Sequence, residues 1–129
     1  MNHQHTVFVC SNCGGTAQMR TDGIASEGEK LLNQLQQLHQ DWDLREDCTI
    51  QGVTCMGVCD RSCAIAFVSS GKYTYLFSSL PVAEKHLEST ALAVLDCASL
   101  YCSKPDGMMA YRDRPKLLRS LVLARIPSI

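Results

Sequence analysis

Cysteine is the residue that most constrains this chain. Eight of the 129 residues are cysteine, about 6% and several times the usual share in a cytosolic protein. Five of them fall in two short segments, 10–13 and 55–63. The first residues lack the basic and apolar regions of a secretory signal, so we expect a cytoplasmic protein in which disulfides are rare. Metal binding or thiol chemistry is then the expected role of the cysteines.

Composition favours one folded domain over residues 1–129. Hydrophobic residues make up 46% of the chain and the formal net charge is −1, a balance that supports a buried core. We expect no membrane span, since no apolar run approaches the length that one needs. Charge is uneven, at −5 over residues 1–103 and +4 over 104–129, so the C-terminal part is a basic extension. We expect no nucleic-acid partner, because no basic sheet with interleaved aromatic residues is visible.

The first half of the chain predicts strand, helix and strand. Residues 6–9 form a short β-branched and aromatic run that fits a buried strand. Ser26 and Glu29 have the spacing of a capping box, and the leucines that follow predict a helix ending near Trp42. Residues 48–53 predict the second strand.

The second half predicts a hairpin and two helices. Residues 64–68 and 73–77 flank a short loop that contains glycine, as in a β-hairpin. An apolar stripe from Pro81 to about Cys102 predicts a long helix. Pro115 is expected to open a last short helix through Leu123, with its basic side chains on a solvated face.

This element order predicts a thioredoxin-like α/β fold with a mixed four-stranded sheet flanked by helices. A helical crossover makes the first two strands parallel, and the hairpin adds antiparallel strands.

The two cysteine segments follow the first two strands. Cys10 and Cys13 come at the end of the first strand, and Cys55 and Cys59 come after the second. Neighbouring strand ends would bring the four thiols together. Thiolate sulfur is the preferred ligand of both iron–sulfur clusters and structural zinc. The sequence therefore predicts one metal centre with four cysteine ligands.

Longer motifs add a resemblance to known families. The C-M-G-x-C turn that enters the strand at residues 64–68 resembles the second ligand pair of thioredoxin-like [2Fe–2S] ferredoxins and of the related complex I subunit. The stretches C-S-N-C, C-M-G-V-C-D-R-S-C-A-I-A-F, G-K-Y-T-Y-L-F, D-G-M-M-A-Y-R-D-R-P and A-R-I-P are similar to an uncharacterised bacterial family of predicted metal-binding proteins, associated with cobalamin-synthesis genes.

The resemblance implies a function for these residues. It implies one [2Fe–2S] cluster held by Cys10, Cys13, Cys55 and Cys59, in a non-enzymatic electron carrier or redox sensor that docks with a redox partner protein. It also makes a homodimer plausible. The first two ligands of such ferredoxins are farther apart than Cys10 and Cys13, so Cys63 is the reserve ligand.

Two alternatives stay open. C-x-x-C followed by two glycines also suits zinc, which would fit a metal-delivery accessory protein linked to cobalamin synthesis. The same C-x-x-C after a strand is typical of a thiol–disulfide oxidoreductase. Against that reading, the intervening dipeptide is Ser11-Asn12, and no proline precedes the hairpin strand.

The remaining cysteines and histidines are expected to have no functional role. Cys48, Cys97 and Cys102 lie in a predicted strand and an apolar helix, and we expect core or incidental thiols. His5 is expected to face solvent.

Overall fold

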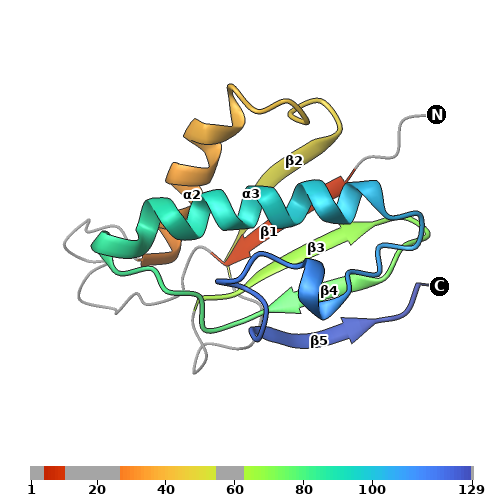
Figure 1. Ribbon diagram of the computed structural model, residues 1–129. Coiled ribbons are helices and arrows are strands. Elements are labelled where there is room, and N and C mark those ends of the chain that lie inside the picture. Colours follow the sequence, from red (N-terminus) through yellow and green to blue (C-terminus); the bar gives the residue numbers. More distant parts are fainter. Residues whose placement is uncertain (1–4, 11–26, 55–62, 129) are drawn as a thin grey trace.

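The structure, a computed structural model, describes residues 5–10, 27–54 and 63–128 (Figure 1). Its strands and α-helices follow in the order expected up to the long helix, and a further strand then ends the chain. They are β1 (His5–Cys10), α2 (Glu27–His39), β2 (Cys48–Val53), β3 (Ile65–Ser69), β4 (Thr74–Phe77), α3 (Leu87–Ser103) and β5 (Val122–Ile126).

These strands form one mixed sheet in the order β2-β1-β3-β4-β5. β1 and β2 run parallel, and the other neighbours are antiparallel. Helix α2 is the crossover between the parallel pair, as such a connection requires. The predicted mixed sheet and flanking helices are thus confirmed, with five strands in place of four.

The fifth strand replaces the helix that was expected to run through Leu123. Leu118 N donates to the carbonyl of Pro115, 3.0 Å away, so this stretch begins as a turn. The chain then extends as β5 and pairs with β4, where Arg125 lies opposite Tyr75. An unpaired β4 edge offers a row of backbone donors and acceptors, and the local helical spacing does not outweigh pairing with them.

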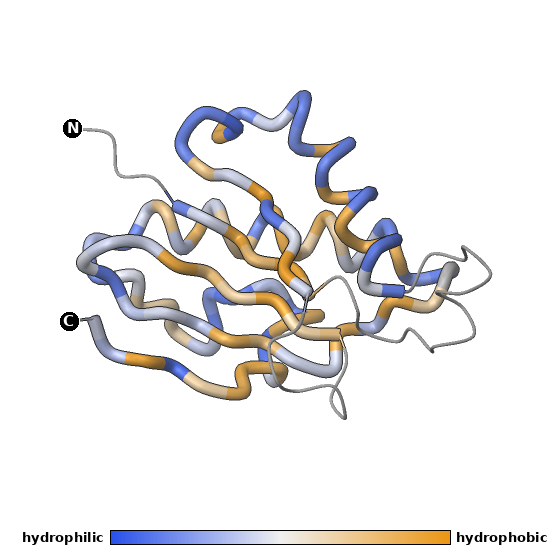
Figure 2. Tube along the Cα trace, turned by 180° about the vertical axis from the view of Figure 1, so that it is seen from behind, coloured by the Kyte–Doolittle hydropathy of each residue, from blue (hydrophilic) through white to orange (hydrophobic). Residues whose placement is uncertain are grey.

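One face of the sheet is covered by helices. Helices α2 and α3 pack against each other and lie across this face (Figure 1). Alternate strand residues point into the resulting core and are fully buried, among them Val7, Val9, Ile65, Phe67, Tyr75 and Phe77. The view from behind in Figure 2 shows hydrophobic segments along the central strands. Phe8, Val68 and Leu76 belong to the other face and are only half-buried.

Helix α3 begins later than the apolar stripe predicted. A single 3-10 turn covers Glu84–His86, and the α-helix runs from Leu87 to Ser103. Among the described residues, no helix is both long and apolar enough to cross a bilayer.

Candidate functional site

Cys10 lies at the carboxyl end of β1, beside the end of β2. The parallel register sets Cys10 opposite Val53, so Thr54 continues past the Cys10 side chain. The Cys10 thiol donates to the carbonyl oxygen of Thr54 at 3.8 Å, and only 1% of Cys10 is exposed. In the sequence, Cys55 is the next residue after Thr54.

The chain returns to the same place after residues 55–62. Cys10 N donates to the carbonyl of Ala64 at 3.1 Å, and Leu80 N donates to the carbonyl of Cys63, also at 3.1 Å. Cys63 is 0% exposed. Cys10 therefore lies next to Thr54, which precedes the segment 55–62, and next to the backbone of Ala64, which follows it.

This arrangement brings two of the candidate ligand residues close together. Cys10 and Cys63 come to the same end of the sheet, and both offer thiol sulfur, a suitable ligand for iron–sulfur clusters and zinc. Cys13, Cys55 and Cys59 lie outside the described residues, so the four-cysteine set stays a prediction. In the part of the chain that the structure describes, no three histidine, cysteine or acidic side chains gather as a metal site.

A second cluster of polar groups lies at the other end of the sheet, around Lys72. The side chain is 8% exposed. Its ammonium contacts Nε2 of His5 at 2.8 Å and the carbonyls of Tyr101 and Cys102, each at 3.2 Å. The three hydrogens of the ammonium thus have three acceptors. The two carbonyls belong to the last turn of α3, so Lys72 caps the negative end of this helix.

His5 differs from its expected position in solvent. It is buried in β1, with Nδ1 3.3 Å from the carbonyl of Asp47. Its ring also meets that of Tyr101 edge to face, with centroids 5.9 Å apart. The alternation in β1 carried this signal, because His5 has the same parity as the core residues Val7 and Val9.

The cysteines outside the two segments are of two kinds. Cys97 is a core thiol, 3.7 Å from the sulfur of Met109, and burial raises its pKa to about 12. Cys48 is also buried, but Cys102 is only half-buried. The pKa of Cys48 is raised, mainly by its hydrogen-bonding interaction with the Cys102 side chain and secondly by burial. The same interaction and the charge of Lys72 lower the pKa of Cys102.

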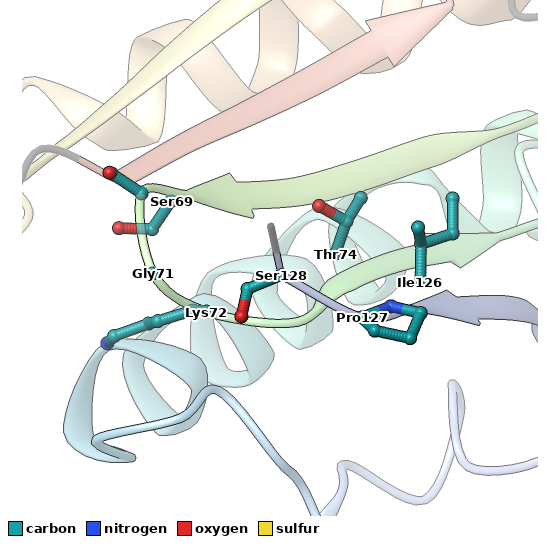
Figure 3. Close-up of a pocket in the computed structure, with 8 residues that line it drawn as sticks. Ser69, Gly71, Lys72, Thr74, Ile126, Pro127 and Ser128 are labelled. Atoms are coloured by element: carbon teal, nitrogen blue, oxygen red, sulfur yellow. The ribbon is translucent and has the colours of Figure 1, made fainter.

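Two hollows flank the loop between β3 and β4. One, of about 390 Å³, is lined by His5, Lys72 and Cys102 among others. The other, of about 330 Å³, lies between the loop and the end of β5 and is drawn in Figure 3. There Lys72 extends away from Ile126 and Pro127. The functional groups of Lys72 and Cys102 therefore belong to the first hollow.

The turns of the basic extension are held together by its own arginines. Arg114 donates to the carbonyls of Met109 and Arg119 at 3.1 Å, and Arg119 donates to the carbonyl of Arg112 at 3.0 Å. The prediction of a helix with its basic side chains in solvent is thus wrong for Arg114 and Arg119. These two side chains instead donate to backbone carbonyls in the turns before β5.

Comparisons with known proteins agree with this fold. A family model described as "Protein of unknown function (DUF1636)" matches residues 7–128. A solved structure of a thioredoxin-like [2Fe–2S] ferredoxin from Aquifex aeolicus is similar, with a TM-score of 0.55 and 14% sequence identity. The similarity covers 95% of this chain and 92% of that one. At this identity it shows the thioredoxin-like fold. No match was found among curated proteins.

Proposed function

We propose an iron–sulfur role for this chain, which belongs to the family of proteins of unknown function DUF1636. In the proposal, Cys10, Cys13, Cys55 and Cys59 hold one [2Fe–2S] cluster, and the protein is an electron carrier or redox sensor rather than an enzyme. Four thiolates are the usual ligand set of such a cluster.

The position of Cys10 is the main observation that supports this proposal. Its thiol lies 3.8 Å from the carbonyl of Thr54, and its backbone N–H is bonded to Ala64. The segment 55–62, which contributes Cys55 and Cys59 to the proposed set, therefore leaves and rejoins the described fold beside Cys10. A structural similarity to a thioredoxin-like [2Fe–2S] ferredoxin adds to this support.

The described residues also suit a rigid ligand position. Cys10 ends a strand that is paired on both sides, with β2 and with β3. Its burial keeps water from the sulfur, and exclusion of water is one of the factors that set a cluster's potential. When bound, the cluster would supply one-electron chemistry, and the sheet would keep the Cys10 sulfur in a fixed place during the transfer.

The experiment is a visible absorption spectrum of protein purified without oxygen, with assays of iron, zinc and acid-labile sulfide. The proposal expects a coloured protein with iron and sulfide in equal amounts. Cys97→Ser is the matched control, because Cys97 is a buried thiol packed against Met109, and it should leave the spectrum unchanged.

Two other results would each replace the proposal with one of its alternatives. A colourless protein with one zinc per chain would indicate a zinc-carrying accessory protein. A metal-free protein whose Cys10 and Cys13 cycle between dithiol and disulfide, with activity on disulfide substrates, would indicate an oxidoreductase.

The proposal extends to a redox partner protein, a homodimer and a cytoplasmic location. The dimer and the partner derive from the resemblance to thioredoxin-like ferredoxins. Light scattering on the cluster-loaded protein tests the dimer, and a mass of 14.2 kDa would contradict it.

A further inference from the structure

We propose that Cys48 and Cys102 form a second redox site, a dithiol that hydrogen peroxide converts to a disulfide. This site lies at the end of the sheet opposite Cys10 and does not depend on the proposed cluster. Cys48 opens β2 and Cys10 closes β1, and the two strands are parallel with His5 opposite Cys48. Five residue steps along a strand separate these ends by about 16 Å.

A chain of contacts brings the two cysteines together. Cys48 pairs with His5 in the sheet, and His5 contacts Lys72 at 2.8 Å. Lys72 in turn binds the carbonyl of Cys102 at 3.2 Å. The two thiols interact closely enough for each to shift the pKa of the other. The start of β2 and the last turn of α3 therefore lie on the two sides of the same His5–Lys72 contact.

The two thiols differ in access. Cys48 is 1% exposed, whereas Cys102 is half-buried and lines the hollow of about 390 Å³. A small oxidant such as hydrogen peroxide fits this hollow and meets Cys102 first. Cys102 is therefore the attacking thiol, and Cys48 behind it is the resolving thiol.

Electrostatics favours the same division of roles. The hydrogen bond from Cys48 and the charge of Lys72 lower the pKa of Cys102, whereas burial and Asp47 act in the opposite direction. The thiolate is the nucleophile. The His5 ring also lies near this position, against the ring of Tyr101. Burial raises the pKa of Tyr101 to about 12, so its phenol stays neutral. Lys104 lines the same hollow, but Lys72 is the cation bonded to the Cys102 backbone and stabilises a Cys102 thiolate.

The reaction has two steps. The Cys102 thiolate attacks one oxygen of the peroxide, the O–O bond breaks, and hydroxide leaves, which gives a sulfenic acid. Cys48 gives its proton to that hydroxide and attacks the Cys102 sulfur; the S–S bond forms, the S–O bond breaks, and a second hydroxide leaves with a proton from solvent as water. Overall, two thiols and one peroxide give one disulfide and two waters. Each sulfur loses one electron and the peroxide gains two.

Peptide mapping tests the proposal on the full chain. The reduced protein is treated with hydrogen peroxide, the remaining thiols are alkylated, and fragment spectra locate the disulfide; tryptic peptides alone are ambiguous because Cys48 shares one with Cys55 and Cys59. We expect a Cys48–Cys102 linkage that a thiol reductant reverses. Cys102 found alkylated, or linked to another cysteine in the unaltered protein, would overturn the proposal.

Two variants separate the roles of the thiols. In Cys48→Ser, Cys102 should stop at the sulfenic acid and be trapped by dimedone. In Cys102→Ser, Cys48 should stay reduced under the same treatment. Because Cys102 is only half-buried, this variant should fold even if serine at the buried Cys48 position prevents folding. Cys97→Ser is the control and should form the linkage as the unaltered protein does. Oxidation of Cys48 in the Cys102→Ser variant would contradict the assigned order.

The rate of alkylation tests Lys72. Cys102 should react at least about tenfold faster than Cys97 at neutral pH, because only a thiolate reacts. Lys72→Met should raise the pH at which Cys102 reaches half its maximal rate. Lys104→Met is the matched control, since Lys104 lines the same hollow but does not contribute to the lowered pKa of Cys102, and it should shift this midpoint less. Equal midpoints in the two variants would show that Lys72 does not stabilise the Cys102 thiolate.

Discussion

The ammonium of Lys72 lies 2.8 Å from Nε2 of His5, in contact with a residue 67 positions earlier in the chain. This bond joins the loop between β3 and β4 to the first residue of β1. Since Lys72 also binds the carbonyls of Tyr101 and Cys102, one side chain holds a loop, a strand and the end of a helix together.

Replacement of Lys72 should therefore destabilise the fold. Lys72→Met keeps the length of the side chain but leaves two helix carbonyls and His5 without this donor. Loss of hydrogen bonds to a charged group costs about 1.5–3 kcal/mol, and we expect a decrease of that order in the free energy of unfolding, measured with urea. Lys104→Met, at a half-buried lysine that lines the same hollow, should change it by less than about 0.5 kcal/mol. Equal effects of the two changes would contradict the capping role.

Gly107 should resist substitution more than Gly71. Both have a positive φ, of 79° and 77°, which costs a non-glycine residue about 1–2 kcal/mol. A Cβ at Gly107 would also lie 2.7 Å from the buried ring of Tyr101, whereas one at Gly71 would meet nothing within 4 Å. Gly107→Ala should thus lower the melting temperature more than Gly71→Ala. The same shift in both variants would mean that the Tyr101 ring moves aside freely.

Arg114 should stabilise the turns that lead into β5. Its guanidinium donates to the carbonyls of Met109 and Arg119 and lies 5.7 Å from the centre of the Tyr75 ring. Arg114→Met should cost about 1–3 kcal/mol in unfolding free energy and increase proteolysis near the C-terminus. Arg112→Met is the matched control because the Arg112 side chain is exposed. Should Arg112→Met be the more damaging change, this explanation of the extension would be wrong.

Alkaline pH should destabilise the protein through Cys97. Burial raises the pKa of this thiol from 9.0 to about 12, so between these values the unfolded chain loses a proton that the folded protein keeps. The contribution to stability is complete below pH 9 and is lost as the pH rises toward 12. One such proton gives a slope of up to about 1.4 kcal/mol per pH unit. Chemical denaturation from pH 8 to 11 should show a shallower decline for Cys97→Ala than for the unaltered protein, and parallel declines would contradict the prediction.

Serine variants should identify the fourth cluster ligand. In the proposed set, Cys13→Ser abolishes the visible spectrum of the anaerobically purified protein, because a thiolate ligand is lost. Cys63→Ser should retain it, with Cys63 acting as a buried thiol before β3. The reverse result would make Cys63 the ligand in place of Cys13, and loss of the spectrum in both variants would require a different set.

Much of the fold could be read from the sequence because its patterns are local. A β-branched and aromatic run defined β1, weak alternation defined β2, and two runs around a glycine-containing loop defined the hairpin, each to within two residues. The spacing of leucines defined α2. The end of the chain could not be read in this way. Residues 115–123 have helical spacing, but the free edge of β4 lies far away in the sequence, and pairing with it makes residues 122–126 a strand.

The same division holds for the two sites. The sequence by itself determined that Cys10 ends a strand and that two cysteine segments follow neighbouring parallel strands, because strand order and spacing are enough for that. Only the tertiary structure decided that His5, Lys72, Cys48 and Cys102 meet at one end of the sheet. They come from β1, a hairpin loop, β2 and α3, and their contacts depend on burial and helix capping between elements that no local pattern connects.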